Sequence, residues 1–149
     1  MVWVLAIWAL AVAVFDVRQR RVPNFLLILV AVPTCLMLVF DRSGPLHVGA
    51  GSAALGFAAA LLLLLPGYLI GSVGAGDVKL GAVLGLLLGW SAVLWALLCA
   101  ALVLGAMALA VKLRWPHLAK TYRLPGAVAL AVGFEIATWV RPLWSGVET

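Results

Sequence analysis

Apolar runs that approach the length of a bilayer crossing follow one another along this chain. They cover Val2 to Val17, Pro23 to Phe40, Val48 to Ile70, Val78 to Gly89, Ser91 to Val111 and Pro125 to Val140. A helix needs roughly 20 such residues to cross the hydrocarbon core, and lipid forbids unpaired backbone. No stretch alternates as barrel strands do. The sequence therefore predicts an all-α, polytopic membrane bundle of about six helices.

The composition agrees with lipid as the main solvent. Hydrophobic residues make up 66% of the 149 residues, whereas soluble domains contain roughly 45–50%. No repeat, linker or low-complexity segment divides the chain, so we expect one integral-membrane domain over residues 1–149. The first run is not expected to be a signal peptide, because its basic residues follow it instead of preceding it.

Basic residues gather on one set of alternate loops. The set consists of Arg18, Arg20, Arg21, Lys79, Lys112, Arg114, Lys120 and Arg123, against Arg42 and Arg141 on the other side. The positive-inside rule then predicts that the richer side is cytoplasmic and that both termini face outward. The formal net charge of +5 follows from these loops, so anionic lipid is the expected partner and nucleic acid is not.

Two aspartates stand at this predicted cytoplasmic boundary. Asp16 ends the first apolar run, and Asp77 closes the segment Gly74-Ala75-Gly76-Asp77 between two later runs. Both runs beside them are short of a full span, which draws each carboxylate toward the bilayer, where it is costly and usually functional. Two carboxylates brought close together do not both ionise easily, so one can serve as acid and the other as base. This pair would equip an aspartic protease, with no metal or cofactor.

Gly74 and Gly76 fit such a site, because glycine permits positive φ and the close approach of a substrate backbone. The alternative is that they only allow close helix packing, as glycines in membrane proteins often do. The chain contains fifteen glycines, so the motif alone leaves both interpretations open.

The combined motifs resemble those of the type IV prepilin peptidases, the GxGD aspartic proteases. The matching segments are Gly74-Ala75-Gly76-Asp77-Val78-Lys79-Leu80, then Asp16 followed by Arg18, Arg21 and Val22-Pro23-Asn24, and finally Leu124-Pro125-Gly126-Ala127 with Gly133. The resemblance implies that Asp16 and Asp77 form the catalytic pair. It further implies that Gly74, Gly76, Lys79, Pro23, Asn24 and Pro125 bind substrate or act as backbone hinges.

The resemblance also implies a substrate and a location. The expected substrates are precursors of type IV pilins, pseudopilins or Flp-type pilins, whose short leader is cut on the cytoplasmic side of a bacterial inner membrane. Larger members carry an insertion with paired, zinc-binding cysteines and also N-methylate the product. Cys35 and Cys99 lie far apart inside apolar runs and are expected to be buried core thiols. The chain thus looks like the short, peptidase-only form of Flp or tight-adherence systems.

Three other polar residues carry weaker expectations. Lys79 is expected to reach lipid headgroups, and Arg20 either pairs with Asp16 or anchors the cytoplasmic face. Glu135 falls near mid-bilayer and must be satisfied structurally or line a substrate cavity. His47 and His117 have no partner at ligand spacing, so no metal site is expected.

Two other functions compete with the protease. One is a non-enzymatic transporter or proton-relay subunit that uses intramembrane carboxylates. Transport sites usually lie near the midplane, whereas Asp16 and Asp77 come out at one interface. The other is a catalytically silent homologue that acts as an assembly partner.

Overall fold

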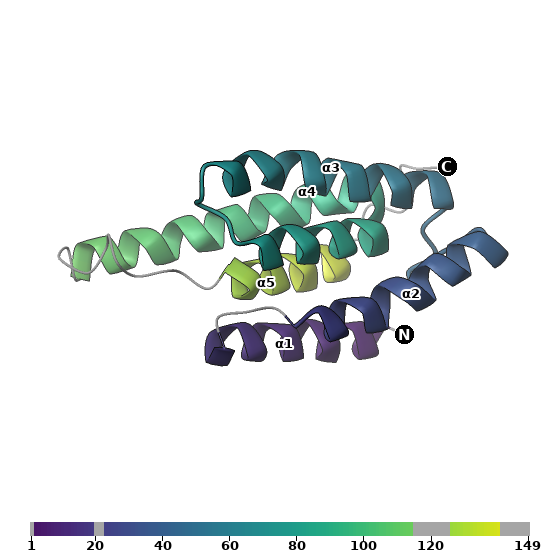
Figure 1. Cartoon of the computed structure of the whole chain (residues 1–149), viewed down its shortest axis with the longest axis horizontal. Coiled ribbons are helices and arrows are strands. Elements are labelled where there is room, and N and C mark those ends of the chain that lie inside the picture. Colours follow the sequence, from purple (N-terminus) through teal and green to yellow (C-terminus); the bar gives the residue numbers. More distant parts are fainter. Residues whose placement is uncertain (1, 20–22, 115–125, 141–149) are drawn as a thin grey trace.

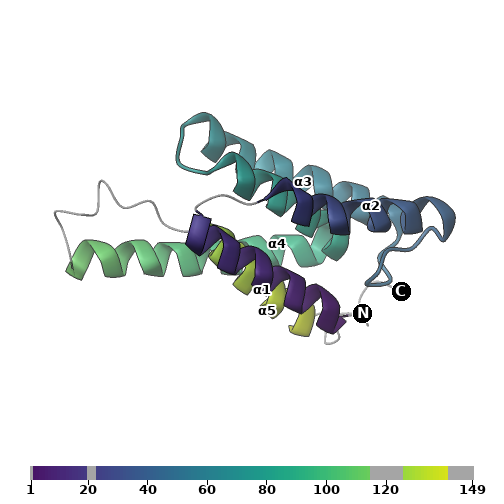
Figure 2. The same cartoon turned by 60° about the horizontal axis from the view of Figure 1, so that its bottom comes forward.

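The protein folds into helices that lie side by side along one long axis (Figure 1, Figure 2). A computed structural model describes residues 2–19, 23–114 and 126–140. The helices are α1 (Val2–Gln19), α2 (Asn24–Phe40), α3 (Ala50–Leu69), α4 (Ala75–Arg114) and α5 (Gly126–Val140). Within these residues no strand forms, and the sole β-type pairing is the isolated bridge between Ser43 and Gly49. The predicted all-α class is confirmed.

The helix count differs from the predicted six, because α4 covers both the fourth and the fifth predicted spans. Its backbone departs from helical geometry at Gly89, where φ is 78° and ψ is −177°. Figure 1 shows the chain doubling back there, from the teal part of α4 to the green part. The Trp90 N–H donates to Ser52 Oγ over 3.1 Å across this break. We refer to residues 75–88 as the first arm and residues 90–114 as the second arm.

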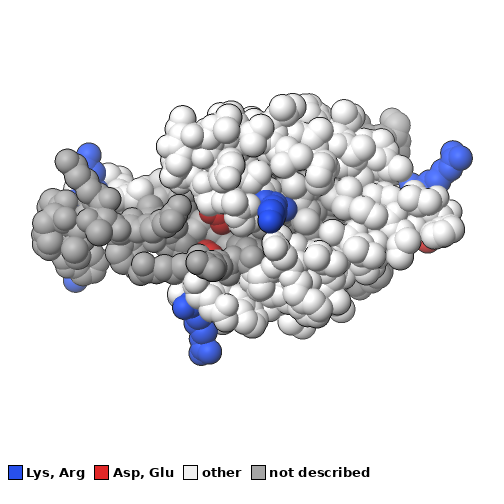
Figure 3. Space-filling model, viewed as in Figure 1, with Lys and Arg blue, Asp and Glu red and all other residues white. Residues whose placement is uncertain are grey.

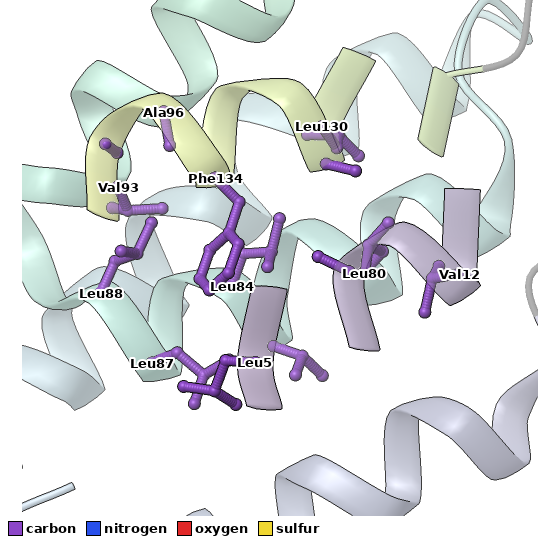
Figure 4. Packing of buried hydrophobic residues seen from close by; sticks show 14 of the residues in the cluster. Leu5, Val12, Leu80, Leu84, Leu87, Leu88, Val93, Ala96, Leu130 and Phe134 are labelled. Carbon is purple, nitrogen blue, oxygen red and sulfur yellow. The ribbon is translucent and has the colours of Figure 1, made fainter. Parts of the chain in front are cut away.

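The first arm is the central element of the bundle. Its leucines at positions 80, 84, 87 and 88 are all buried, and a helix that is apolar on every side belongs in an interior. Figure 4 shows these leucines with Val12 of α1 and with Leu130 and Phe134 of α5. The end of this arm that carries Asp77 is therefore held by packing from several helices.

Close backbone contact joins α3 to the first arm. A Cβ atom added to Gly56 would collide with the backbone of Gly85 and Gly89, and one added to Gly85 would collide with Gly56. Small residues at a crossing let two membrane helices approach closely. The α2 helix is attached at its start, where the Trp8 indole N–H of α1 donates to the Leu26 carbonyl over 2.8 Å.

The helices are suited to a membrane. Three of those described, α1, α3 and α4, are long and apolar enough to cross one, and α2 and α5 are shorter apolar helices. The α1 helix extends past the predicted end of its apolar run at Val17 and includes Gln19, the last described residue of this segment; Arg20 lies outside the described residues. The expectation of buried cysteines is wrong, since Cys35 is exposed and Cys99 is half-buried. Membership of an apolar run does not reveal whether a side chain faces lipid or core.

Candidate active site

Asp16 lies one turn before the end of α1, on the face that packs against α5. Its side chain is 8% exposed. The backbone N–H of Ala127, at the start of α5, donates to Asp16 Oδ2 over 3.3 Å. The first amides of a helix have no partner inside that helix, so the carboxylate satisfies a donor that α5 leaves open.

Asp77 lies in the first turn of α4 and folds back on the residue that precedes the helix. The Gly74 carbonyl accepts from the N–H groups of Asp77 and Val78 over 3.0 Å and 3.2 Å. In return, the Gly74 N–H donates to Asp77 Oδ2 over 3.3 Å. An acidic side chain that reaches back to the N-cap amide forms half of a capping box. The sequence Gly-x-x-Asp thereby fixes the half-buried carboxylate of Asp77 locally.

The two carboxylates converge on consecutive residues of α5. A Cβ atom built on Gly126 would lie 2.5 Å from Asp77 Oδ2 and 2.7 Å from its Cγ, and the next residue donates its N–H to Asp16. Figure 3 shows acidic atoms in a recess on this face of the molecule. Asp16 and Asp77, predicted as a pair, therefore lie beside the first two described residues of α5.

This arrangement has the components for acid–base chemistry on water. Each carboxylate is oriented by a backbone amide. Asp77 lies in the first turn of α4, and Asp16, near the end of α1, lies beside the start of α5. Two such groups beside one site can divide the roles of proton acceptor and proton donor. Residues 2–19, 23–114 and 126–140 contain no group of three or more His, Cys, Asp or Glu side chains placed to bind a metal.

Gly74 and Gly76 do not use the positive φ that glycine permits. Among the described glycines only Gly71 and Gly89 have positive φ, and Gly76 is part of the first turn of α4. Gly74 instead sits against its own acidic partner, because a Cβ there would lie 3.2 Å from Asp77 Oδ2. The motif therefore works at this end of α4 through close approach and not through left-handed backbone.

Lys79 and Asn24, both predicted as site residues, contact each other. The Lys79 ammonium group donates to Asn24 Oδ1 over 3.3 Å, so this side chain reaches across to α2. Pro23 precedes α2 with φ −69° and ψ 124°, the extended geometry that proline allows before a helix. Pro125 lies outside the described residues.

Glu135 is separate from the pair. It stands about 13 Å along α5 from Gly126, at 1.5 Å per residue, and is half-buried. Its side chain forms a hydrogen bond with Trp139, whose ring meets that of Trp3 edge-on at 5.3 Å between centroids. Of the two expectations for Glu135, the hydrogen bond with Trp139 supports the first, in which the side chain is satisfied structurally.

Gly126 and Ala127 are site residues that sequence reasoning did not select. They appeared only as part of the proline-led start of the last helix. Their signal was a proline at the beginning of an apolar run, which is common at helix starts and so does not single out a functional site. Only the packing of α5 between α1 and α4 gives these residues a place beside the carboxylates.

Comparison with known proteins supplies one match. The model of the type IV leader peptidase family matches residues 3–110, a range that contains both aspartates. The search of curated proteins and the search of solved structures give no match.

Proposed function

This chain belongs to the type IV leader peptidase family, and from that premise we propose that it is a membrane aspartic endopeptidase. It removes the short leader from precursors of type IV pilins, pseudopilins or Flp-type pilins. The observation that carries the proposal is the convergence of Asp16 and Asp77 on Gly126 and Ala127. A peptidase of this kind needs two carboxylates beside one scissile bond, and the fold unites two that are 61 positions apart in the chain.

The chemistry follows from the pair. One carboxylate takes a proton from water as that water attacks the peptide carbonyl. The other, in its protonated form, donates to the developing oxyanion, and a proton then passes to the leaving amine. Because water itself is the nucleophile, no covalent intermediate is required. The backbone donors at Gly74 and Ala127 keep the two carboxylates in place.

We propose that cleavage takes place on the cytoplasmic side. Arg18 in the last turn of α1 and Lys112 and Arg114 in the last turn of α4 support this orientation. The reversal at Gly89 brings the end of α4 back to the side where α1 ends (Figure 1). Basic residues beside the ends of membrane helices favour the cytoplasm, and the aspartate pair lies at the same end of the bundle.

The finer substrate assignment rests on the resemblance to short, peptidase-only members. Such a protein would cut Flp-type precursors and leave the new amino terminus unmethylated. The separate positions of Cys35 on α2 and Cys99 on α4 agree with this assignment, because a zinc site needs ligands that face one another.

Reconstitution tests the proposal directly. The purified protein in liposomes is incubated with a defined Flp-type precursor and with S-adenosylmethionine, and the products are identified by mass spectrometry. We expect a free leader and an unmodified mature pilin. An intact precursor would overturn the protease, and proton flux by the same liposomes would then favour the transporter alternative. A methylated product would overturn the peptidase-only assignment.

A further inference from the structure

We propose that Gly126 is a positioning residue whose missing side chain sets the separation of Asp16 and Asp77. The inference rests on the proposed function and adds a part that the family match does not cover, since that match ends at residue 110. Gly126 belongs to α5, whereas the two carboxylates come from α1 and α4.

Gly126 leaves no space for a side chain beside Asp77. A Cβ atom there would lie within 3.0 Å of Oδ1, Oδ2 and Cγ of Asp77. Real Cβ atoms essentially never come so close to other heavy atoms, so even alanine would displace the carboxylate or push α5 away. The Asp77 Oδ2 atom also accepts a hydrogen bond from the Gly74 N–H over 3.3 Å. Moving the carboxylate away from Gly126 would therefore disturb that hydrogen bond.

The start of α5 is held in place by buried side chains. Ala127 and Phe134 are fully buried, and Leu130 is 6% exposed; their spacing of three and four residues places them on one helix face. That face packs into the core around the first arm of α4 (Figure 4). A shift of α5 would also break the hydrogen bond that the Ala127 N–H donates to Asp16.

The contact of Gly126 with Asp77 and the hydrogen bond of Ala127 with Asp16 involve neighbouring residues of α5. Because Gly126 touches Asp77 and its neighbour binds Asp16, one rigid dipeptide fixes both carboxylates at once. Misplacement of reacting groups by about 1 Å can cost about 100-fold in rate. We therefore expect Gly126→Ala to lower kcat about 100-fold and to leave KM nearly unchanged, because the variant alters the acid–base pair and not the substrate contacts.

A thermal-stability cycle tests the contact without any activity. Gly126→Ala is made in the parent protein and in the Asp77→Ala variant, and the Tm of all four proteins is measured in detergent. We expect Gly126→Ala to lower the Tm by about 4 °C or more when the carboxylate is present and to have little effect when it is absent. If the Gly126→Ala variant does not fold, the addition of Asp77→Ala should restore folding. That outcome would support the same contact more strongly. Equal Tm changes in the two backgrounds would overturn the inference.

Gly133→Ala is the matched control on the same helix. Its added Cβ would collide with the Ala96 backbone and press against the Ala100 backbone in the second arm of α4. Neither aspartate is among the atoms that this Cβ would meet. It should lower the Tm equally with and without the Asp77 carboxylate. Unchanged kcat in Gly126→Ala would overturn the positioning role. If the parent protein cuts no precursor, the proposed function fails, whereas the Tm cycle still reports whether Gly126 and Asp77 are coupled.

Discussion

The Lys79 ammonium group donates a hydrogen bond to Asn24 Oδ1 over 3.3 Å and so joins the second turn of α4 to the first turn of α2. Lys79 follows Asp77 by two residues, and 55 residues separate the bonded pair in sequence. The contact links the start of α2 to the end of α4 that carries one of the two carboxylates. It therefore gives α2 a means to influence the candidate active site.

Breaking this link should weaken cleavage modestly. Lys79→Met and Asn24→Ala should each lower kcat/KM by about two- to fivefold, since an exposed hydrogen bond contributes about 0.5–1 kcal/mol net. The double variant should be no worse than either single one, because both remove the same contact. Steady-state cleavage of one precursor by the four proteins measures this, and losses that simply add would show that the two side chains act separately.

Removing either carboxylate should abolish the reaction. Asp16→Asn and Asp77→Asn nearly preserve shape but each removes one proton-transfer partner, so cleavage should fall by at least about 1,000-fold. The double variant should lose no more, because the pair acts as one unit. Asp41→Asn, at the opposite end of α2, is the control and should cleave normally. Substantial cleavage by either single variant, at normal membrane levels, would rule out the dyad mechanism.

The orientation can be mapped with single cysteines. In a background with Cys35→Ala and Cys99→Ala, a cysteine at Lys112 should react with a membrane-impermeant reagent from the cytoplasm. A cysteine at Ser43, in the segment between α2 and α3, should react from outside. The reverse pattern would contradict the positive-inside assignment and with it a cytoplasmic cut.

The reversal of α4 should depend on glycine at position 89. Gly89→Ala combines positive φ with a Cβ only 2.6 Å from Ser52 Oγ and 2.8 Å from Val48 Cγ1. We expect a loss of at least about 2 kcal/mol, because a left-handed residue and a close contact are both penalised. Thermal unfolding followed by tryptophan fluorescence measures it. Gly105→Ala, with nothing within 4 Å of the added Cβ, should be neutral or stabilising, and an equal loss there would remove the special role of Gly89.

Much of the fold could be predicted from the sequence, because lipid leaves few solutions for apolar runs. The predicted ranges match the ends of α2, α3 and α5 to within two residues. The predicted boundary between the runs Val78–Gly89 and Ser91–Val111 falls at Gly89, where the chain does reverse, although the two arms are continuous enough to count as the single helix α4. The sequence could not reveal that Ser52 of α3, 38 positions away, supplies the hydrogen-bond partner for Trp90 at this reversal.

The sequence alone determined the chemistry that is available. Two aspartates stand at the boundary of apolar runs, because a charged side chain is costly in the lipid interior and is better tolerated at an interface. One of them, Asp77, is fixed by the glycine that precedes α4. The tertiary structure decided what holds the pair together: α5 packs between α1 and the first arm of α4 and brings Gly126 and Ala127 to both carboxylates. Such contacts depend on helix faces and crossings. An apolar run is enough to predict that a helix forms in the membrane. Which of its residues face the neighbouring helices is decided only by how the helices pack.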